Sequence, residues 1–264
     1  MVKGDTAEQA AVLYKTELER TFGAMYSDID PLSHLQQELS DHGPLIPSSK
    51  VNKNNEVVTA APRANLSLAP LDEPEQRIYS SEQSKLILEQ LSEELVSARR
   101  GDCEKDTSLK QIIPYVMLKH KDDYFAYKRL SGSGEKRLVD SISIGVGGHM
   151  NYRSDDRDHA GLLEVIAQES LRELNEELII GQDVKVDIKW DDMKILNDDK
   201  EDVGKVHIGV ILFAELSSDD VQVRETDSLE GSFVSKEWLS ENRDKLESWS
   251  RMYIDSLDLA ETSV

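Results

Sequence analysis

Apolar residues recur along this chain with two spacings, one typical of helices and the other typical of strands. Spacing of three or four residues predicts amphipathic helices over residues 6–22, 81–99, 161–178, 237–243 and 245–257. Alternating or continuous apolar runs predict strands over residues 112–119, 124–130, 141–146, 184–190 and 206–216. The last run is nearly continuous in Val, Ile, Leu and Phe, so we expect it to be a central strand. Helices and strands that interleave in this way favour an α/β fold, a mixed sheet with helices on both faces.

A proline-rich stretch separates the first predicted helix from the rest. Five of the seven prolines lie between residues 44 and 74, and no aromatic residue occurs between Tyr26 and Tyr79. Such a stretch buries too little apolar surface to offset the entropy lost on ordering, so we expect a flexible linker. The predicted organisation is an N-terminal helical extension at 1–39, the linker at 40–80, a connecting helix at 81–104, the main domain at 105–258 and a tail at 259–264.

Three carboxylates gather on one face of the predicted helix at 161–178. Glu173, Glu176 and Glu177 are spaced i, i+3 and i+4, so their side chains converge and repel one another. A hard divalent cation relieves that repulsion, and Mg²⁺ is the usual ion of all-oxygen sites. Arg172 can brace a carboxylate through a charge-assisted hydrogen bond, and Glu164 falls on a nearby face. The alternative reading is an ordinary amphipathic helix with a solvated acidic face.

The opposite face of this helix is expected to be buried, and a glycine shortly after the helix is expected to end it. A stripe at three- or four-residue spacing predicts the buried side, made of Leu163, Ala167, Leu171, Leu174 and Leu178. Gly181 lies just beyond, and a glycine there can end a helix in a left-handed conformation.

Composition narrows the class of partner. The chain has 264 residues with 52 acidic and 31 basic side chains, a net charge of -21, which disfavours binding to a nucleic acid backbone. Its single cysteine excludes an internal disulfide framework. No signal peptide is recognisable, and no apolar run approaches the ~18 residues of a membrane span. We therefore expect a cytoplasmic protein with no membrane partner.

The acidic helix resembles the signature of the Nudix (MutT-like) hydrolases. The matching positions keep the spacing of that signature and are Glu164, Arg172, Glu173, Leu174, Glu176, Glu177 and Ile180. Two positions depart from it: the signature glycine is matched only by Gly148, which implies an insertion of about ten residues, and Ile179 replaces the later glycine. The segments at 111–115, 143–151, 203–209 and 246–250 are similar to a Nudix subgroup of predicted phosphoesterases with such an insertion. The resemblance covers residues 105–258.

The resemblance implies a fold, a cofactor and roles for particular residues. The fold would be a Nudix-type α/β/α sandwich with a mixed central sheet, and the cofactor Mg²⁺ or Mn²⁺. The implied metal ligands are the Gly148 carbonyl, Glu173, Glu176, Glu177 and a further loop carboxylate, for which Glu230 is preferred over Glu225. Glu173 would be the general base, and Arg172 and Glu164 would complete the catalytic group.

Several side chains near the expected cleft have an alternative reading. His149 and Arg129 are candidates for binding substrate phosphate, although Arg129 is equally well read as surface charge. Glu225 and Glu230 can also be simple surface charges. His207 lies within an apolar strand, and we expect it to be a hydrogen-bonded structural histidine.

The implied reaction is cleavage of a phosphoanhydride bond in a nucleoside diphosphate linked to another moiety. The signature does not specify that moiety. Two other classes of function remain open at this stage. One is a catalytically silent nucleotide-binding module, against which the intact acidic cluster argues. The other is an interaction protein in which residues 1–100 bind a partner or a second copy of the chain.

Overall fold

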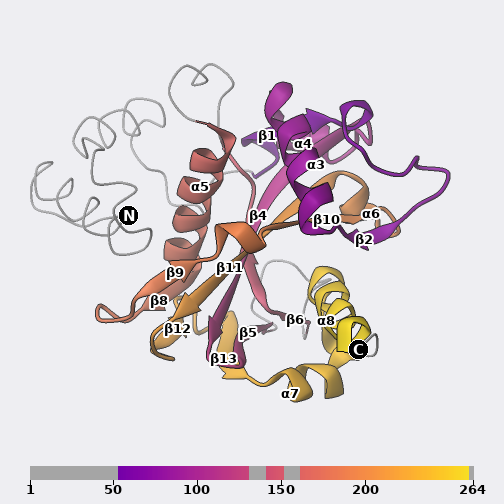
Figure 1. The fold of residues 1–264 in the computed structure, drawn as a ribbon. Helices are drawn as coiled ribbons and strands as arrows, with labels where there is room; N and C mark the ends of the chain where they lie inside the picture. Colours follow the sequence, from indigo (N-terminus) through magenta and orange to yellow (C-terminus); the bar gives the residue numbers. More distant parts are fainter. Residues whose placement is uncertain (1–52, 131–140, 152–160, 262–264) are drawn as a thin grey trace, which may run out of the picture.

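A large mixed sheet forms the centre of the molecule (Figure 1). The structure is a computed structural model that describes residues 53–130, 141–151 and 161–261. The main strand order is β13 (Leu229–Val234), β5 (Asp123–Arg129), β4 (Leu109–His120), β11 (His207–Leu216), β10 (Lys194–Asp198) and β2 (Gln76–Ile78). Five more strands join this sheet: β1 (Val57–Pro62), β3 (Val96–Arg99), β6 (Ile142–Ser143), β7 (Gly145–Gly147) and β9 (Val186–Ile188).

The central pair of strands, β4 and β11, is parallel, whereas their other partners are antiparallel. The prediction of a central strand over residues 206–216 is confirmed by β11, whose residues are buried except for Glu215. A crossover is required between parallel neighbours, and the chain between β4 and β11 includes the helix α5 (Leu162–Glu177).

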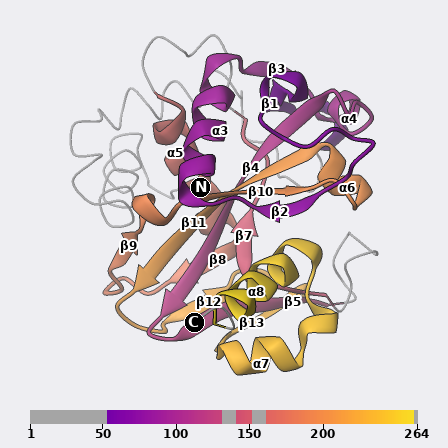
Figure 2. The same ribbon diagram turned by 45° about the vertical axis from the view of Figure 1, so that its right-hand side comes forward.

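Helices cover both faces of the sheet, which confirms the predicted fold class (Figure 2). On one face, α5 and α3 (Ser81–Glu93) contribute Ile166, Leu174, Ile87 and Leu91 to one apolar core. On the other face, α7 (Lys236–Glu241) and α8 (Ser248–Glu261) contribute Leu239 and Ile254 to a second core. Within the described ranges, no helix is long and apolar enough to cross a membrane.

Short elements connect these layers. A small second sheet pairs β8 (Leu178–Ile180) with β12 (Val221–Val223). The short helices are α4 (Arg100–Cys103) and α6 (Asp202–Lys205), with 3-10 turns η3 (Lys53–Asn55), η4 (Arg63–Asn65), η7 (Trp190–Asp192) and η8 (Arg243–Lys245).

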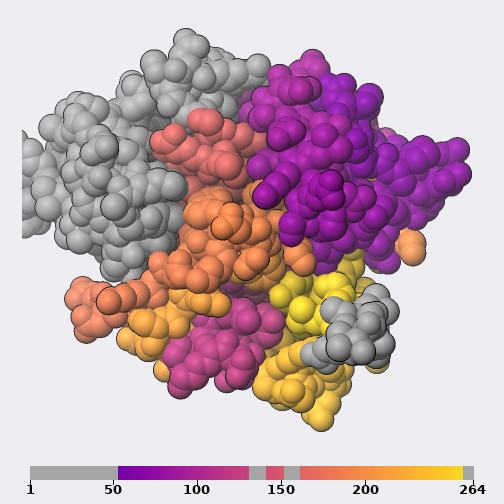
Figure 3. Space-filling view, in the orientation of Figure 1, coloured from indigo at the N-terminus to yellow at the C-terminus, as the bar shows by residue number. Residues whose placement is uncertain are grey.

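The prediction of a flexible linker at 40–80 is wrong where strands β1 and β2 form, at residues 57–62 and 76–78. Strand β1 pairs with both β3 and β4, and β2 extends the sheet beside β10. Arg63, just after β1, makes two hydrogen bonds to Asp199 at 2.8 and 2.6 Å. Figure 3 shows this N-terminal part of the described chain, in indigo and purple, packed onto the rest of the body. The segment is ordered because other parts of the chain provide the apolar surface and strand partners that it lacks locally.

The predicted connecting helix is also shorter than expected. Helix α3 begins after Ser80, whose hydroxyl accepts from Gln83 N, and ends at Glu93. Residues 96–99 pair with β1 instead. The predicted N-terminal helix at 6–22 lies outside the described residues.

Candidate active site

Helix α5 carries the acidic cluster and is fixed by its apolar side. Leu162, Ile166 and Leu174 are buried in the core that it shares with the sheet. Leu163, which we expected in the buried stripe, is 46% exposed, because the helix is rotated so that Leu162 faces inward. This orientation leaves the face of Glu176 toward solvent.

The helix ends differently from the prediction. It stops at Glu177 because Leu178 is already extended and begins strand β8. Gly181 does not have the left-handed conformation that we expected. Instead its N–H donates to the Asp220 carbonyl oxygen at 2.9 Å. Pairing with β12 thus takes the place of a glycine stop.

Arg172 links the helix to the loop that follows β7. Its Nη2 lies 2.7 Å from Glu173 Oε1 and 2.7 Å from Glu169 Oε2. The same Nη2 donates to the carbonyl oxygen of His149 at 2.9 Å, and Nη1 donates to Glu176 Oε1 at 3.2 Å. The guanidinium therefore organises three carboxylates and fixes the helix against the glycine loop, which confirms the expected bracing contact.

Gly148 lies directly against the Glu173 carboxylate. A Cβ atom at residue 148 would be 2.1 Å from Glu173 Oε1 and 2.2 Å from Cδ. Any larger residue there would push the carboxylate away, so glycine is required for this close approach. The match of Gly148 to the signature glycine thus has a physical basis in the fold, across the intervening insertion.

Burial and like charge act together on the carboxylates. Burial raises the pKa of Glu173 from 4.5 to about 7; Arg172 opposes this rise, and Glu176, Glu169 and Glu177 add to it. The pKa of Glu177 is also raised, chiefly by burial. Such shifts are common at functional sites.

Arg129, Glu225 and Lys53, all outside the helix, act on the pKa of Glu177. The positive charge of Arg129 lowers the pKa of Glu177, and the negative charge of Glu225 raises it. Arg129 also lies over the Tyr127 ring, 5.9 Å from its centroid. Arg224 holds the loop before Glu225 against the end of α5, because its Nε donates to the Asn175 carbonyl at 2.9 Å. Arg129 and Glu225 therefore belong to the surroundings of the cluster.

Glu230 lies within strand β13, whereas we expected it in a loop just before a strand. It lies opposite Lys128 in the ladder between β13 and β5, and it alternates with Leu229, which is buried in the core on the α5 side. It lines a cavity of about 330 Å³ together with Leu130, Gln222, Val223, Thr226, Leu229 and Gly231. Glu164 is half-buried in the first turn of α5.

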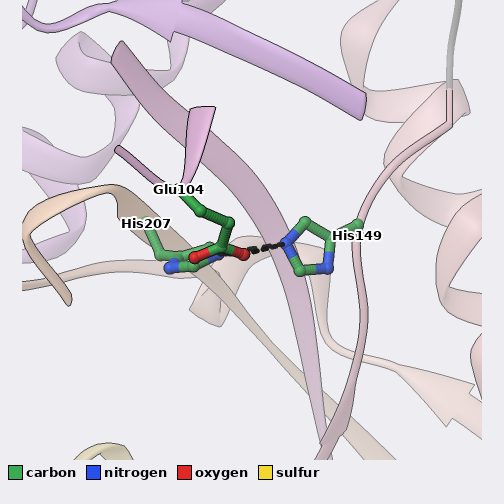
Figure 4. Close-up of side chains that lie close together, drawn as sticks. All are labelled: Glu104, His149 and His207. Carbon is green, nitrogen blue, oxygen red and sulfur yellow. Dashed lines mark hydrogen bonds and ion pairs between the residues drawn. The ribbon is translucent and has the colours of Figure 1, made fainter. Parts of the chain in front are cut away.

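His149 turns its side chain toward two residues that we had not assigned to the site. Its Nε2 is 3.0 Å from His207 Nε2 and 3.8 Å from Glu104 Oε1 (Figure 4). His207 is hydrogen-bonded, as expected, through Nδ1 to the Val203 carbonyl oxygen. Glu104 gave no signal in the sequence, because it follows a four-residue helix and has no characteristic spacing from either histidine.

Comparison with known proteins identifies the family. Over 213 residues the chain is 36% identical to Protein YmaB of Bacillus subtilis (strain 168), a match that covers 79% of this chain and 100% of YmaB. The chain belongs to the YmaB family. No protein-family model matches it.

Among solved structures, this YmaB family member is similar to Tm1382, a candidate Nudix hydrolase, with a TM-score of 0.56 and 22% identity over 76% of this chain and 98% of Tm1382. The YmaB-family chain therefore has a Nudix fold, and the fold that the sequence resemblance implied is confirmed. A Nudix-family hydrolase from Clostridium perfringens aligns with 57% of this chain and 97% of its own length, at 17% identity and a TM-score of 0.34.

Proposed function

We propose that this YmaB-family protein is a divalent-metal-dependent hydrolase that cleaves a phosphoanhydride bond in a nucleoside diphosphate linked to another moiety. The contact between Glu173 and Gly148 is the observation that carries the proposal. It holds a buried carboxylate, 9% exposed, beside the loop that the signature glycine provides. A purely solvated acidic face would not bury its central carboxylate or require a glycine opposite it.

The residues present fit a hard divalent cation. The donors are all oxygens, from Glu173, Glu176 and Glu177, and Arg172 is the cation in contact with two of them. The absence of a side chain at Gly148 lets the Glu173 carboxylate lie directly against the loop, because a Cβ there would be 2.1 Å from Glu173 Oε1. When bound, Mg²⁺ or Mn²⁺ would neutralise substrate phosphates and help to position water. The Gly148 carbonyl is proposed as a backbone ligand.

Glu173 is proposed as the general base. Its pKa of about 7 is near neutral, where a carboxylate both accepts a proton from water and is present in its ionised form. Arg172 positions that carboxylate by its 2.7 Å contact and is itself fixed by the His149 carbonyl. Glu164 is proposed to assist from the first turn of the same helix.

The remaining carboxylate ligand is better assigned to Glu225 than to Glu230. Glu225 acts on the pKa of Glu177, whereas the ladder places Glu230 opposite Lys128. Arg129, whose positive charge also acts on Glu177, is proposed to bind a substrate phosphate, with the cavity beside β13 as space for the linked moiety. A cytoplasmic location, and association through residues 1–39, also stay proposals.

The test is turnover of a panel of substrates by wild type and two variants. The panel contains nucleoside triphosphates, ADP-ribose, dinucleoside polyphosphates, nucleotide sugars and capped RNA, each with Mg²⁺, Mn²⁺ or chelator. We expect metal-dependent cleavage of one class. Glu176→Gln or Glu177→Gln should lower it by about 100-fold or more without unfolding the protein, because each removes a metal ligand.

Glu89→Gln is the matched control, since Glu89 is an exposed glutamate on α3 and should retain full turnover. Undiminished turnover in both α5 variants would refute the proposed site. If no substrate turns over but metal-dependent nucleotide binding is present, the chain is a binding module instead.

A further inference from the structure

A second cluster of metal-ligand side chains lies next to the acidic helix. It consists of Glu104 after α4, His149 after the glycine loop and His207 at the start of β11. The three ligand atoms lie within 4.8 Å of one another. Figure 4 shows the Glu104 carboxylate and the two rings converging from separate segments. We call Glu104, His149 and His207 the Glu–His–His triad.

The outer hydrogen bond of His207 fixes which of its two ring nitrogens has the lone pair. Its Nδ1 is 2.6 Å from the Val203 carbonyl oxygen. A carbonyl oxygen only accepts, so Nδ1 carries the proton and Nε2 of the neutral ring has a lone pair. Histidines that bind metals usually have this outer contact, since it fixes the ring and its tautomer.

The two imidazole rings make a direct hydrogen bond to each other through their Nε2 atoms. His149 Nε2 and His207 Nε2 are 3.0 Å apart, so one proton lies between two nitrogens that both have the geometry of ligands. Glu104 Oε1 is 3.8 Å from each of them. Replacing that proton by a cation would give all three donors a common partner.

We propose that the Glu–His–His triad binds a transition metal ion of the Zn²⁺ class, at a site distinct from the all-oxygen cluster on α5. Two imidazoles and a carboxylate are donors that Zn²⁺ takes readily, whereas Mg²⁺ prefers oxygen alone. For metal–ligand bonds of about 2.0–2.1 Å, tetrahedral ligands are spaced by about 3.3 Å. The observed spacings of 3.0 and 3.8 Å lie on either side of that value, so shifts of a few tenths of an ångström suffice.

The site is reachable and leaves one position for water. The Glu104 side chain is 33% exposed, whereas those of His207 and His149 are 6% and 14% exposed. Arg100 Nε also contacts Glu104 Oε1, at 3.5 Å, and would hold the carboxylate from outside. Three protein ligands with an open fourth position are typical of zinc sites that bind water or substrate.

The triad shares its loop with the proposed active site but is independent of the proposed activity. Arg172 donates to the His149 carbonyl, and Gly148 is the preceding residue. An ion in the triad would therefore fix the loop that carries Gly148. The site is defined by binding alone, so it can exist even if the chain hydrolyses nothing.

The test is metal binding by the chelator-treated full-length chain, with excess Mg²⁺ present to occupy the acidic cluster. Co²⁺ is titrated and followed by its visible absorption, and Zn²⁺ is titrated against a chromophoric chelator. We expect one equivalent to bind. His207→Gln should weaken binding by about 100-fold or more and Glu104→Gln by about 10-fold or more, the range for losing ligands and their supports.

His120→Gln is the matched control, because His120 also contacts a backbone carbonyl through Nδ1, at 2.9 Å from Leu216 O, but lies outside the triad. It should bind like wild type. The proposal is overturned if wild type binds neither ion, if both triad variants bind like wild type, or if Glu177→Gln abolishes binding while Glu104→Gln does not. Circular dichroism checks folding, and the partly exposed Glu104 provides a valid variant should His207→Gln not fold.

Discussion

The buried carboxylate of Glu173 should destabilise the metal-free protein at neutral and alkaline pH. Its pKa is about 7 in the fold against an ordinary value of 4.5. Between these values the folded state binds a proton that the unfolded state has lost, so stability falls as pH rises through this window. A difference of one in pKa corresponds to about 1.4 kcal/mol, which gives a loss of roughly 3 kcal/mol above the window.

Glu173→Gln is therefore expected to stabilise the chelator-treated protein while removing its proposed activity. The amide has nearly the shape of the protonated acid, and Arg172 keeps its contacts to Glu169 and Glu176. At about pH 8 the variant should be more stable by roughly 3 kcal/mol, and the advantage should shrink toward about pH 4.

The assay is urea unfolding of both proteins across this pH range, first with chelator and then with Mg²⁺. Mg²⁺ should stabilise wild type more than the variant, because it neutralises the charge that the variant lacks. A variant that is equally or less stable than wild type at about pH 8, or a difference that does not change with pH, would refute this reasoning.

Two further variants test the contacts around this helix and around the buried lysine of strand β4. Gly148→Ala places a Cβ 2.1 Å from Glu173 Oε1, so turnover should fall by about 10-fold or more. Gly161→Ala is the control: a Cβ at residue 161 meets nothing within 4 Å, so turnover in the same assay should not change. Lys110→Met removes the buried ammonium that lies 2.8 Å from Asp199 Oδ1 and should destabilise the fold by about 3 kcal/mol or more in urea unfolding; a loss below about 1 kcal/mol would show that the remaining partners of Asp199 suffice.

The sequence was informative wherever the relevant residues are close along the chain. The cluster of Glu173, Glu176 and Glu177 depends only on helical periodicity, and α5 has nearly the predicted bounds, Leu162–Glu177 against 161–178. Strand β11 was recognisable because a buried strand is continuously apolar. The same local reasoning misplaced Leu163, since the exact rotation of a helix is set by the surface on which it packs.

Residues 57–78 show where local composition is insufficient. They have few large apolar side chains and several prolines, yet Val58 and Ala60 are buried in β1. The residues that pair with this segment are 36 or more positions away in the sequence. Whether a weakly apolar segment becomes a strand depends on an edge being available elsewhere, and that is a property of the assembled sheet.

The sequence by itself determined the acidic helix, the central strand and the α/β class, because helix and strand periodicity are local consequences of backbone geometry. Only the tertiary structure decided that Gly148 meets Glu173, that Glu225 acts on the pKa of Glu177, and that Glu104, His149 and His207 converge. Those contacts join residues 25 to 103 positions apart. Their geometry follows from how strands and helices pack against a common core, which no spacing along the chain encodes.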